Sequence, residues 1–242
     1  MLKKLKQIYF KEQFNPSFIG VFIHPFFFAR RGLYKHIRSI ASFIKGKTLD
    51  VGCGSKPYEK LYQSTEYIGL EMDTEENRQK KKADFFYDGS TFPFRNEEFE
   101  SVVANQVFEH VFNPDRFLSE VNRILKLNGY LLLTVPFVWD EHEQPYDYAR
   151  YSSFGLQSIL NKQGFTVQQH KKSIHDIRII FQLINMYIFK QTNSKYKLLN
   201  IITTFFLMAP FNIVGSLIYW IFPGNKDLYL DNIVLAQKIK NV

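Results

Sequence analysis

The sequence contains a single cysteine, Cys53, among 242 residues. One thiol excludes a disulfide scaffold and a multi-cysteine zinc site, and it fits a reducing compartment. Internal repeats and low-complexity tracts are also lacking, and a hydrophobic content of 45% is ample to bury a core. The chain is therefore not a disordered one, and its length suits one large α/β domain or a compact domain with an appendage.

Acidic residues are nearly lacking from the first 47 positions, where Glu12 faces ten Lys or Arg. This segment carries +9 against +8 for the whole chain, so the remainder is close to neutral. It also contains eight Phe, and a basic aromatic segment suits an anionic lipid surface. We predict a helical segment over 1–47 that contacts an anionic membrane surface; the alternative is a basic helix that packs its aromatics on the core. Nucleic acid is not an expected partner.

An apolar stretch over 18–29 follows the N-terminal lysines, as in a secretory signal. His24 and Pro25 interrupt this stretch, and Arg30 follows it without a small-residue cleavage pattern. We therefore expect no secretory signal and a cytoplasmic protein.

From residue 48 onward, short β-rich runs alternate with helical patterns, which predicts a doubly wound α/β domain. Asn113, followed by Pro114, predicts the start of one helix, and Ser152 predicts the start of another that stops at Gly164. We expect seven strands, the last of them antiparallel to its neighbours, at 48–51, 67–71, 83–87, 99–105, 129–135, 165–170 and 232–237.

The turn after the first predicted strand reads L-D-V-G-C-G-S-K-P-Y. Gly52 and Gly54 allow a tight turn and close approach of a ligand to main-chain N–H groups. Glu71 ends the second strand about 20 residues later, where a carboxylate can accept both hydroxyls of a ribose. Asp88 follows the third strand and Asn105 ends the fourth. The pattern predicts a nucleoside-binding site.

Five blocks together resemble class I S-adenosylmethionine-dependent methyltransferases: L-D-V-G-C-G, Y-I-G-L-E-M-D, D-G-S-T-F-P-F, F-E-S-V-V-A-N-Q-V-F-E-H-V and G-Y-L-L-L-T-V-P. The resemblance implies a Rossmann-like sheet and S-adenosylmethionine as cofactor. It also implies one cofactor-binding set: Asp50, Gly52 and Gly54 around the methionine moiety, Glu71 at the ribose, Asp88 and Gly89 at the adenine, Asn105 beside the cofactor, and Met72 as a further cofactor-binding residue.

A redox dinucleotide enzyme is the rival for this fold. The third glycine of G-x-G-x-x-G is lacking, and Pro57 stiffens the point where a pyrophosphate would dock. Methylation of nucleic-acid bases also lacks support, because the N/D-P-P-Y/F pattern is absent after the fourth strand, where the chain reads Asn105-Gln106-Val107-Phe108.

The segment 137–151 brings a histidine, acids and an arginine to the carboxyl edge of the sheet, where ligands bind. A hydroxyl acceptor must lose a proton as it is methylated, and a neutral histidine suits that task. We predict that His142 is the base, that Glu143 or Glu141 orients it, and that Asp147 and Arg150, together with Tyr151, shape the acceptor pocket.

The alternative is that this E-H-E block is a surface ion-pair cluster and that Arg150 only caps the next helix. No metal is expected, because adjacent residues such as Glu141, His142 and Glu143 rarely converge on one ion. Glu109 and His110 match the family's E-H pair and are either near the acceptor or structural.

The block H-E-x-P-x-D-x-x-R at 142–150 is similar to methyltransferases of cell-surface polysaccharide and glycolipid assembly. This resemblance implies a small-molecule or glycan acceptor, in particular a hydroxyl of a lipid-linked sugar. A quinone or isoprenoid methyltransferase is the runner-up. A non-catalytic cofactor-binding partner protein is the alternative from another class.

An apolar insertion over 174–226 separates the last two predicted strands, and Lys197 and Lys226 bracket 28 uncharged residues within it. Because the last strand returns to the same sheet, both ends of the insertion stay on one side of a membrane. Pro210, Asn212 and Gly215 break the long run into two pieces, and the partner stretch 177–189 is short for spanning. We predict an in-plane or re-entrant hairpin, peripheral or monotopic on the inner face of the membrane; the alternative is a cap over the acceptor cleft or a dimer interface.

The predicted division of the chain is therefore a basic segment at 1–47, a methyltransferase domain at 48–173 and 227–242, and the insertion at 174–226. Nothing in the sequence indicates the oligomeric state.

Overall fold

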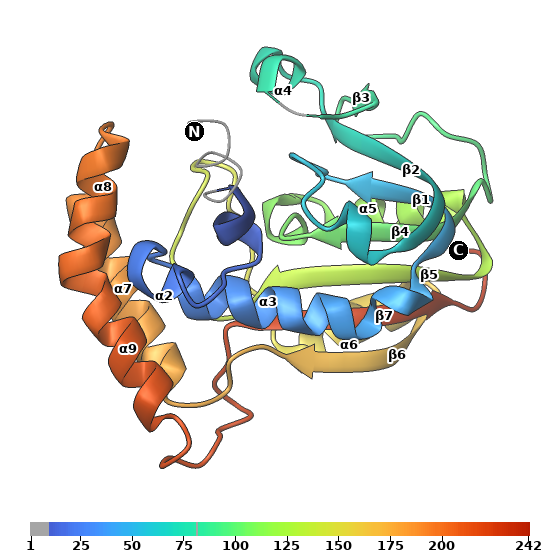
Figure 1. The fold of residues 1–242 in the computed structure, drawn as a ribbon. Coiled ribbons are helices and arrows are strands. Elements are labelled where there is room, and N and C mark those ends of the chain that lie inside the picture. The colour runs from blue at the N-terminus through green and yellow to red at the C-terminus, as the bar shows by residue number, and fades with distance from the viewer. Residues whose placement is uncertain (1–9, 81) are drawn as a thin grey trace. The chain divides into compact units, whose positions relative to one another are not determined.

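The computed structural model describes residues 10–80 and 82–242 (Figure 1). Lys3, Lys4 and Lys6 of the predicted basic segment lie outside the described residues. The chain forms two compact units. The sheet unit comprises Ile37–Phe137, Glu141–Lys171 and Asn232–Val242, and the helical unit comprises 10–36, Val138–Asp140 and Lys172–Asp231. The boundary between them falls within α3 (Phe27–Ile40).

One seven-stranded sheet has the order β3-β2-β1-β4-β5-β7-β6. Each predicted strand is present, and β7 runs opposite to β5 and β6, as expected (Figure 1). The first five strands pair in parallel, as a doubly wound fold requires. The strands are β1 Lys45–Val51, β2 Gln63–Met72, β3 Phe85–Tyr87, β4 Phe99–Asn105, β5 Leu125–Pro136, β6 Phe165–Lys172 and β7 Asp231–Lys238.

Helices of the sheet unit begin where the capping residues predict. The Asn113 side chain accepts a hydrogen bond from the Arg116 N–H at the start of α5, and the Ser152 side chain accepts one from the Gly155 N–H at the start of α6. Besides α3, the helices are α4 Glu75–Lys80, α5 Pro114–Ile124 and α6 Ser153–Lys162, with the short η1 Ala41–Phe43, η2 Glu59–Leu61 and η3 Phe108–His110.

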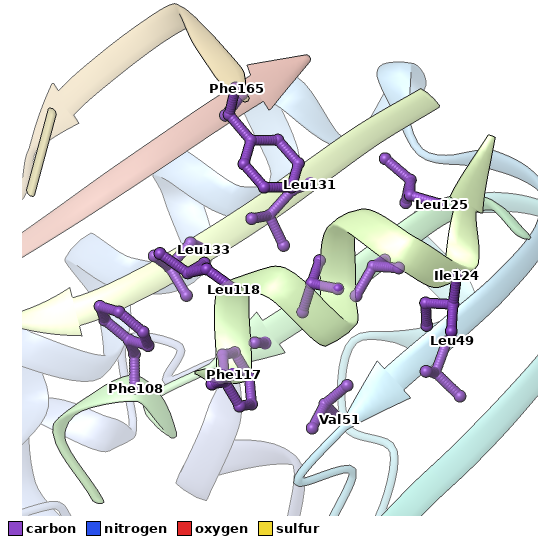
Figure 2. Packing of buried hydrophobic residues seen from close by; sticks show 14 of the residues in the cluster. Leu49, Val51, Phe108, Phe117, Leu118, Ile124, Leu125, Leu131, Leu133 and Phe165 are labelled. Atoms are coloured by element: carbon purple, nitrogen blue, oxygen red, sulfur yellow. The ribbon is translucent and has the colours of Figure 1, made fainter. Parts of the chain in front are cut away.

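The core of the sheet unit lies between α5 and the central strands (Figure 2). Leu118 and Ile124 of α5 are fully buried, as are Leu49 of β1 and Leu131 of β5. Apolar residues at helical spacing on α5 thus meet the continuous apolar runs expected of strands buried on both faces.

A buried lysine fastens the last strand to this core. Lys238 of β7 is 0% exposed, and its ammonium donates hydrogen bonds of 2.7 Å to the carbonyl oxygens of Asn122 and Leu125. Burial lowers the pKa of Lys238. The bonds satisfy carbonyls at the end of α5 that have no partner within the helix.

The helical unit contains α2 Gly20–Ile23, the beginning of α3, α7 Arg178–Thr192, α8 Lys197–Thr203, the π-turn η4 Thr204–Met208 and α9 Ala209–Ile218. The last three form one helix of 22 residues, so the predicted break of the apolar run within this stretch is wrong. Pro210 lies in the first turn of α9, directly after the π-turn, where a missing N–H is tolerated.

Buried amides hold the parts of the helical unit together. Asn212 of α9 donates to the carbonyl oxygens of Val21 and His24 at 3.0 and 3.2 Å and accepts from Asn185 of α7 at 2.9 Å. Gln182 of α7 donates to the Pro25 carbonyl at 3.1 Å. The N-terminal segment and the insertion, which are far apart in sequence, therefore belong to one folded unit.

His24 makes the stability of the helical unit sensitive to pH. Burial, together with the positive charge of Arg30, lowers the pKa of His24 from 6.5 to about 3. The unfolded chain takes up a proton near pH 6.5 and the folded chain only near pH 3, so stability falls as the pH drops between these values, by roughly 1.4 kcal/mol per pH unit.

We expect urea unfolding, followed by tryptophan fluorescence, to show a loss of about 2 kcal/mol between pH 6.5 and pH 5 that His24→Asn lacks. Both tryptophans, Trp139 and Trp220, lie in the helical unit and report on it. Asparagine keeps an acceptor for the Phe26 N–H, which donates to the His24 Nδ1 at 3.0 Å. Equal pH dependence in the two proteins would contradict the assignment.

Candidate active site

Parallel pairing gathers the predicted cofactor residues at one edge of the sheet. β1 lies between β2 and β4, with Val51 opposite Leu70 on one side and Ala104 on the other. The chain leaves all three strands at the same edge, so the glycine turn, Glu71 and Asn105 follow neighbouring strand ends.

The two glycines of the turn have different roles. Both have positive φ, 66° at Gly52 and 53° at Gly54, a conformation that glycine adopts without strain. A Cβ on Gly52 would lie 2.3 Å from the Val107 side chain, so Gly52 permits close packing of the turn on the chain after β4. A Cβ on Gly54 would meet nothing within 4 Å, so Gly54 is the glycine with open space beside it.

Glu71 links the second strand to the glycine turn. Its Oε1 accepts a hydrogen bond of 2.6 Å from the Gly54 N–H, and the residue is 7% exposed. A carboxylate held in this way has a defined position at the end of β2. Met72 beside it is 42% exposed.

Asp88 and Gly89 form the turn after β3. The Asp88 Oδ1 accepts from the Ser90 N–H at 2.8 Å, and the Ser90 hydroxyl bonds to the same oxygen, so the pKa of Asp88 is lowered. Gly89 has φ 85°, and a Cβ there would lie 3.0 Å from the Met72 Cε. The turn thus approaches Met72 closely.

Two tyrosines that the sequence reasoning missed hold the inner part of the site. The Tyr67 hydroxyl donates to the Asp50 Oδ2 at 2.7 Å, and Tyr67 stacks on Tyr62 with ring centroids 6.0 Å apart. Burial raises the pKa of Asp50 to about 7, in opposition to the Tyr67 hydrogen bond and with a contribution from the charge of Glu71. The sequence signal for Tyr67 was a tyrosine within the apolar run of β2, since a buried hydroxyl needs a hydrogen-bond partner.

Asn105 adds a hydrogen-bonding group at the end of β4. Its amide nitrogen donates to the Tyr62 hydroxyl at 3.4 Å. The buried Oδ1 has no hydrogen-bond partner among the described residues. A buried acceptor of this kind fits the hydroxyl or ammonium donors of an amino-acid or nucleoside ligand.

The chain after β5 folds back onto η3 and forms a second cluster. The N–H groups of Tyr148 and Ala149 donate to the Glu109 carbonyl at 2.9 and 3.3 Å. His142 and His110 lie edge to face with ring centroids 4.8 Å apart. The Nε2 atom of each ring is 3.9 Å from Oε1 of Glu109, which is fully buried.

Asp147 is the carboxylate that the structure places at the Nδ1 of His142, 3.2 Å away. It also accepts from the His142 N–H at 2.9 Å and from two Arg150 nitrogens at 2.5 and 2.6 Å. Although burial opposes it, these partners lower the pKa of Asp147 to about 2. Glu143 is exposed in the loop with φ 49°. Of the predicted acceptor-side residues, the structure thus brings together His142, Asp147 and Arg150.

A family model described as a methyltransferase domain matches residues 49–133. An uncharacterised protein of Methanocaldococcus jannaschii is 28% identical over 94 residues, which cover 38% of this chain and 45% of that protein. The match thus spans less than half the length of this curated relative.

Solved structures share the fold at low identity. A phosphoethanolamine N-methyltransferase of Haemonchus contortus, in complex with phosphomonomethylethanolamine and S-adenosylhomocysteine, has a TM-score of 0.54 at 16% identity, covering 96% of this chain and 60% of that one. An S-adenosylmethionine-dependent methyltransferase of Mesorhizobium loti has a TM-score of 0.52 at 10% identity, covering 85% and 97%. The [4+2]-cyclase SpnF has a TM-score of 0.55 at 17% identity, covering 87% and 82%.

These findings define the class of the sheet unit. It has the Rossmann-like class I methyltransferase fold, it contains a methyltransferase domain over 49–133, and the cofactor of this domain is S-adenosylmethionine. A cyclase with the same fold shows that the fold alone does not determine the reaction.

The protonation of Asp50 should make cofactor affinity depend on pH. Since its ionised carboxylate suits the ammonium of the methionine moiety, we expect affinity for S-adenosylhomocysteine to fall about tenfold per pH unit below about pH 7. Tyr67→Phe removes the hydrogen bond that lowers the pKa of Asp50, so the loss should begin at higher pH. Calorimetric titration between about pH 6 and 8.5 measures both effects. A pH-independent affinity in the wild type, matching Asp50→Asn, would exclude this role.

Proposed function

We propose that this protein transfers the methyl group of S-adenosylmethionine to a hydroxyl of an amphiphilic acceptor at a membrane, in particular a lipid-linked sugar. One observation carries the catalytic part: the glycine turn, Glu71 and Asn105 meet at the sheet edge at which the histidine cluster also lies. The exposed apolar surface of the helical unit supports the acceptor class.

The proposed cofactor site uses the polar groups at the ends of β1 to β4. Asp50, Gly52 and Gly54 surround the methionine moiety, and the orphan oxygen of Asn105 accepts a hydrogen bond from it. Glu71, positioned by the Gly54 N–H, receives the ribose hydroxyls.

The adenine end of the same cofactor lies at the turn after β3. Gly89 and Met72 approach each other closely enough to border a flat ring, and Asp88 stands next to them. A carboxylate at this position accepts hydrogen bonds, which suits the exocyclic amine of an adenine.

Methyl transfer from a sulfonium is an in-line displacement. The acceptor oxygen forms a bond to the methyl carbon, the carbon–sulfur bond breaks, and the electron pair stays on sulfur as neutral S-adenosylhomocysteine. Positioning supplies much of the rate. The hydroxyl proton must also leave, and the cluster of Glu109, His110 and His142 provides the polar groups at which the acceptor oxygen is held.

The helical unit buries amides beside a small apolar cluster and exposes many large apolar residues. Asn185 and Asn212 are fully buried, whereas Phe206, Leu217 and Trp220 are 68%, 64% and 74% exposed. So much exposed apolar surface is unusual for a water-soluble unit, and it suits a surface that faces lipid. Further exposed apolar residues of the unit are Phe18, Ile19, Ile180, Tyr187, Tyr196, Leu198, Leu199, Ile202, Phe205, Leu207, Ile213, Val214, Tyr219, Ile221 and Phe222.

Within the described part of the chain one helix, Lys197–Ile218, is long and apolar enough to cross a membrane, with a mean hydropathy of 1.9 and only 28% of its most apolar stretch buried. β6 precedes the insertion and β7 follows it in the same sheet, so a single crossing is excluded. α7 has 15 residues, fewer than the about 20 that span a bilayer, and its Lys190 pairs with Asp140 at 3.0 Å. We therefore propose in-plane, monotopic binding on the inner face of the membrane.

The charge of the helical unit fits an anionic lipid surface. Its described segments hold 10 Lys or Arg against 5 Asp or Glu, a net charge of +5, and the sequence of residues 1–9 adds three lysines to reach the +8 of the whole chain. The sheet unit is neutral by the same count. A basic and apolar unit favours the cytoplasmic leaflet, where anionic lipids attract basic residues.

Incubation of the full chain with methyl-labelled S-adenosylmethionine and separate lipid, glycan, RNA and protein fractions tests the acceptor. We expect label in the lipid-linked glycan fraction. Label in quinones or isoprenoid lipids would favour the second enzymatic interpretation, and cofactor binding with no label in any fraction would favour a non-catalytic partner protein. Glu71→Ala is the control, which should bind S-adenosylmethionine weakly and transfer little methyl label.

His142→Ala should lower the rate of methyl transfer by on the order of 100-fold or more, because the variant loses a polar group of the acceptor cluster. Affinity for S-adenosylhomocysteine should not change, since His142 lies on the acceptor side. His170→Gln is the matched control, because His170 bonds to Asn232 on β7 and should keep full activity. If His142→Ala kept wild-type turnover, His142 would have no catalytic role.

Vesicle sedimentation tests the membrane surface. The triple variant Phe206→Gln, Leu217→Gln, Trp220→Gln should bind vesicles containing phosphatidylglycerol at least tenfold more weakly than the wild type, because each change removes about 2 kcal/mol of apolar burial in lipid. The matched control Leu127→Gln, Phe154→Gln, Ile239→Gln changes exposed apolar residues of the sheet unit and should bind normally. Equal binding of the two variants, or a wild type that remains soluble beside vesicles, would contradict the proposal.

A further inference from the structure

The cluster after β4 and β5 brings three electron-pair donors together in the sheet unit. One carboxylate oxygen of Glu109 and one ring nitrogen from each of His110 and His142 lie within 4.8 Å of one another. Glu109 and His110 are adjacent in η3, whereas His142 comes from the loop after β5, 32 positions further along the chain. Both adjacent side chains reach the same point because η3 is a tight helical turn.

Hydrogen bonds on the far sides of the two rings determine which nitrogens face Glu109. The Nδ1 of His110 is 2.8 Å from the Tyr146 carbonyl oxygen, which can only accept a hydrogen bond, so this nitrogen carries the proton. The Nδ1 of His142 is 3.2 Å from the Asp147 carboxylate, to which it donates in the same way. The Nε2 of each ring is thereby turned toward Glu109.

Three potential ligand atoms consequently converge on one point. The Nε2 atoms of both rings lie 3.9 Å from Oε1 of Glu109, which is fully buried. Two imidazole nitrogens and one carboxylate oxygen at this spacing form a set that a cation can share. A divalent metal ion supplies two positive charges at the point where all three donors converge.

We propose that Glu109, His110 and His142 bind a divalent transition-metal ion of the zinc class. Two imidazole nitrogens and one carboxylate oxygen suit zinc, whereas magnesium and calcium prefer oxygen ligands alone. Zinc–nitrogen bonds of about 2.0 Å place tetrahedral ligand atoms about 3.3 Å apart, so each side chain needs to move by only about half an ångström.

Residues around the three ligands have the features of a second coordination shell. A metal-binding histidine commonly donates its other N–H to a carbonyl or carboxylate, as His110 does to Tyr146 and His142 does to Asp147. Asp147 is in turn fixed by two bonds from Arg150. The side chains of His110 and His142 are 17% and 28% exposed, so the ligand set has a side that an acceptor oxygen or water can reach.

The catalytic use of this ion rests on the proposed function, whereas its binding does not. A bound divalent ion would lower the pKa of an acceptor hydroxyl, which would then release its proton to solvent more readily than the free hydroxyl. The resulting oxygen would attack the methyl carbon while the carbon–sulfur bond breaks. His142 then acts as a ligand in place of the base that the sequence predicted, and Asp147 is a positioning residue.

Metal titration of the full chain in detergent tests the site directly. After treatment with a chelator, we expect the wild type to take up one equivalent of Zn²⁺, and one of Co²⁺ with the visible absorption of a tetrahedral site. His110→Gln and His142→Gln should each weaken zinc binding at least 100-fold, and Asp147→Asn by about 10- to 100-fold. His170→Gln, the matched control, should bind like the wild type.

Folding and activity are followed separately. Circular dichroism and S-adenosylhomocysteine binding should match the wild type in His110→Gln and His142→Gln, which shows that both variants fold. These two variants therefore test the metal site even if Glu109→Gln does not fold. Absence of zinc and cobalt uptake, or uptake that the histidine variants do not change, would overturn the proposal. Stoichiometric zinc without methyl transfer to any fraction would sustain the metal site and refute the proposed function, which keeps the two failures distinct.

Discussion

The candidate site depends on the parallel pairing of β1 between β2 and β4. Main-chain hydrogen bonds set this register, in which Val51 stands opposite both Leu70 and Ala104. Because parallel strands end at the same edge, Glu71 lies within hydrogen-bond distance of the Gly54 N–H although 17 positions separate them. No specific contact between side chains is needed to bring these groups together.

A second set of main-chain bonds builds the acceptor side. β4 and β5 pair with Asn105 opposite Thr134, and the chain after β5 then returns to bond with the Glu109 carbonyl. The histidine of this loop is thereby carried to the histidine of η3. The carboxylate of Asp147, held by Arg150, fixes the ring of His142 and defines the nitrogen that faces Glu109.

The helical unit differs from the sheet unit in the polar groups that its interior contains and in the apolar surface that it exposes. In the sheet unit, apolar side chains such as Leu118 and Leu131 fill the interior. In the helical unit, fully buried amides of Gln182, Asn185 and Asn212 join the helices beside a small apolar cluster, while many large apolar residues are exposed. Buried amides satisfy one another through directional bonds, which suits a unit whose outer surface is adapted to an apolar medium.

The sequence by itself determined the strands, the capped starts of α5 and α6, the glycine turn and the apolar character of the insertion. These features follow from local patterns: alternating apolar runs, Asn113 and Ser152 as caps, and Gly52 and Gly54 where φ is positive. Pro210 misled the same reasoning, because a π-turn before it lets the helix continue.

Only the tertiary structure decided which distant groups meet. It placed Tyr67 on Asp50, Asp147 rather than a neighbour in sequence beside the His142 Nδ1, and His110 next to His142. It also joined the N-terminal segment to the insertion through Asn212. Such pairings depend on sheet register and loop return, which arise from hydrogen bonds between segments far apart in the chain and leave no periodic trace in the sequence.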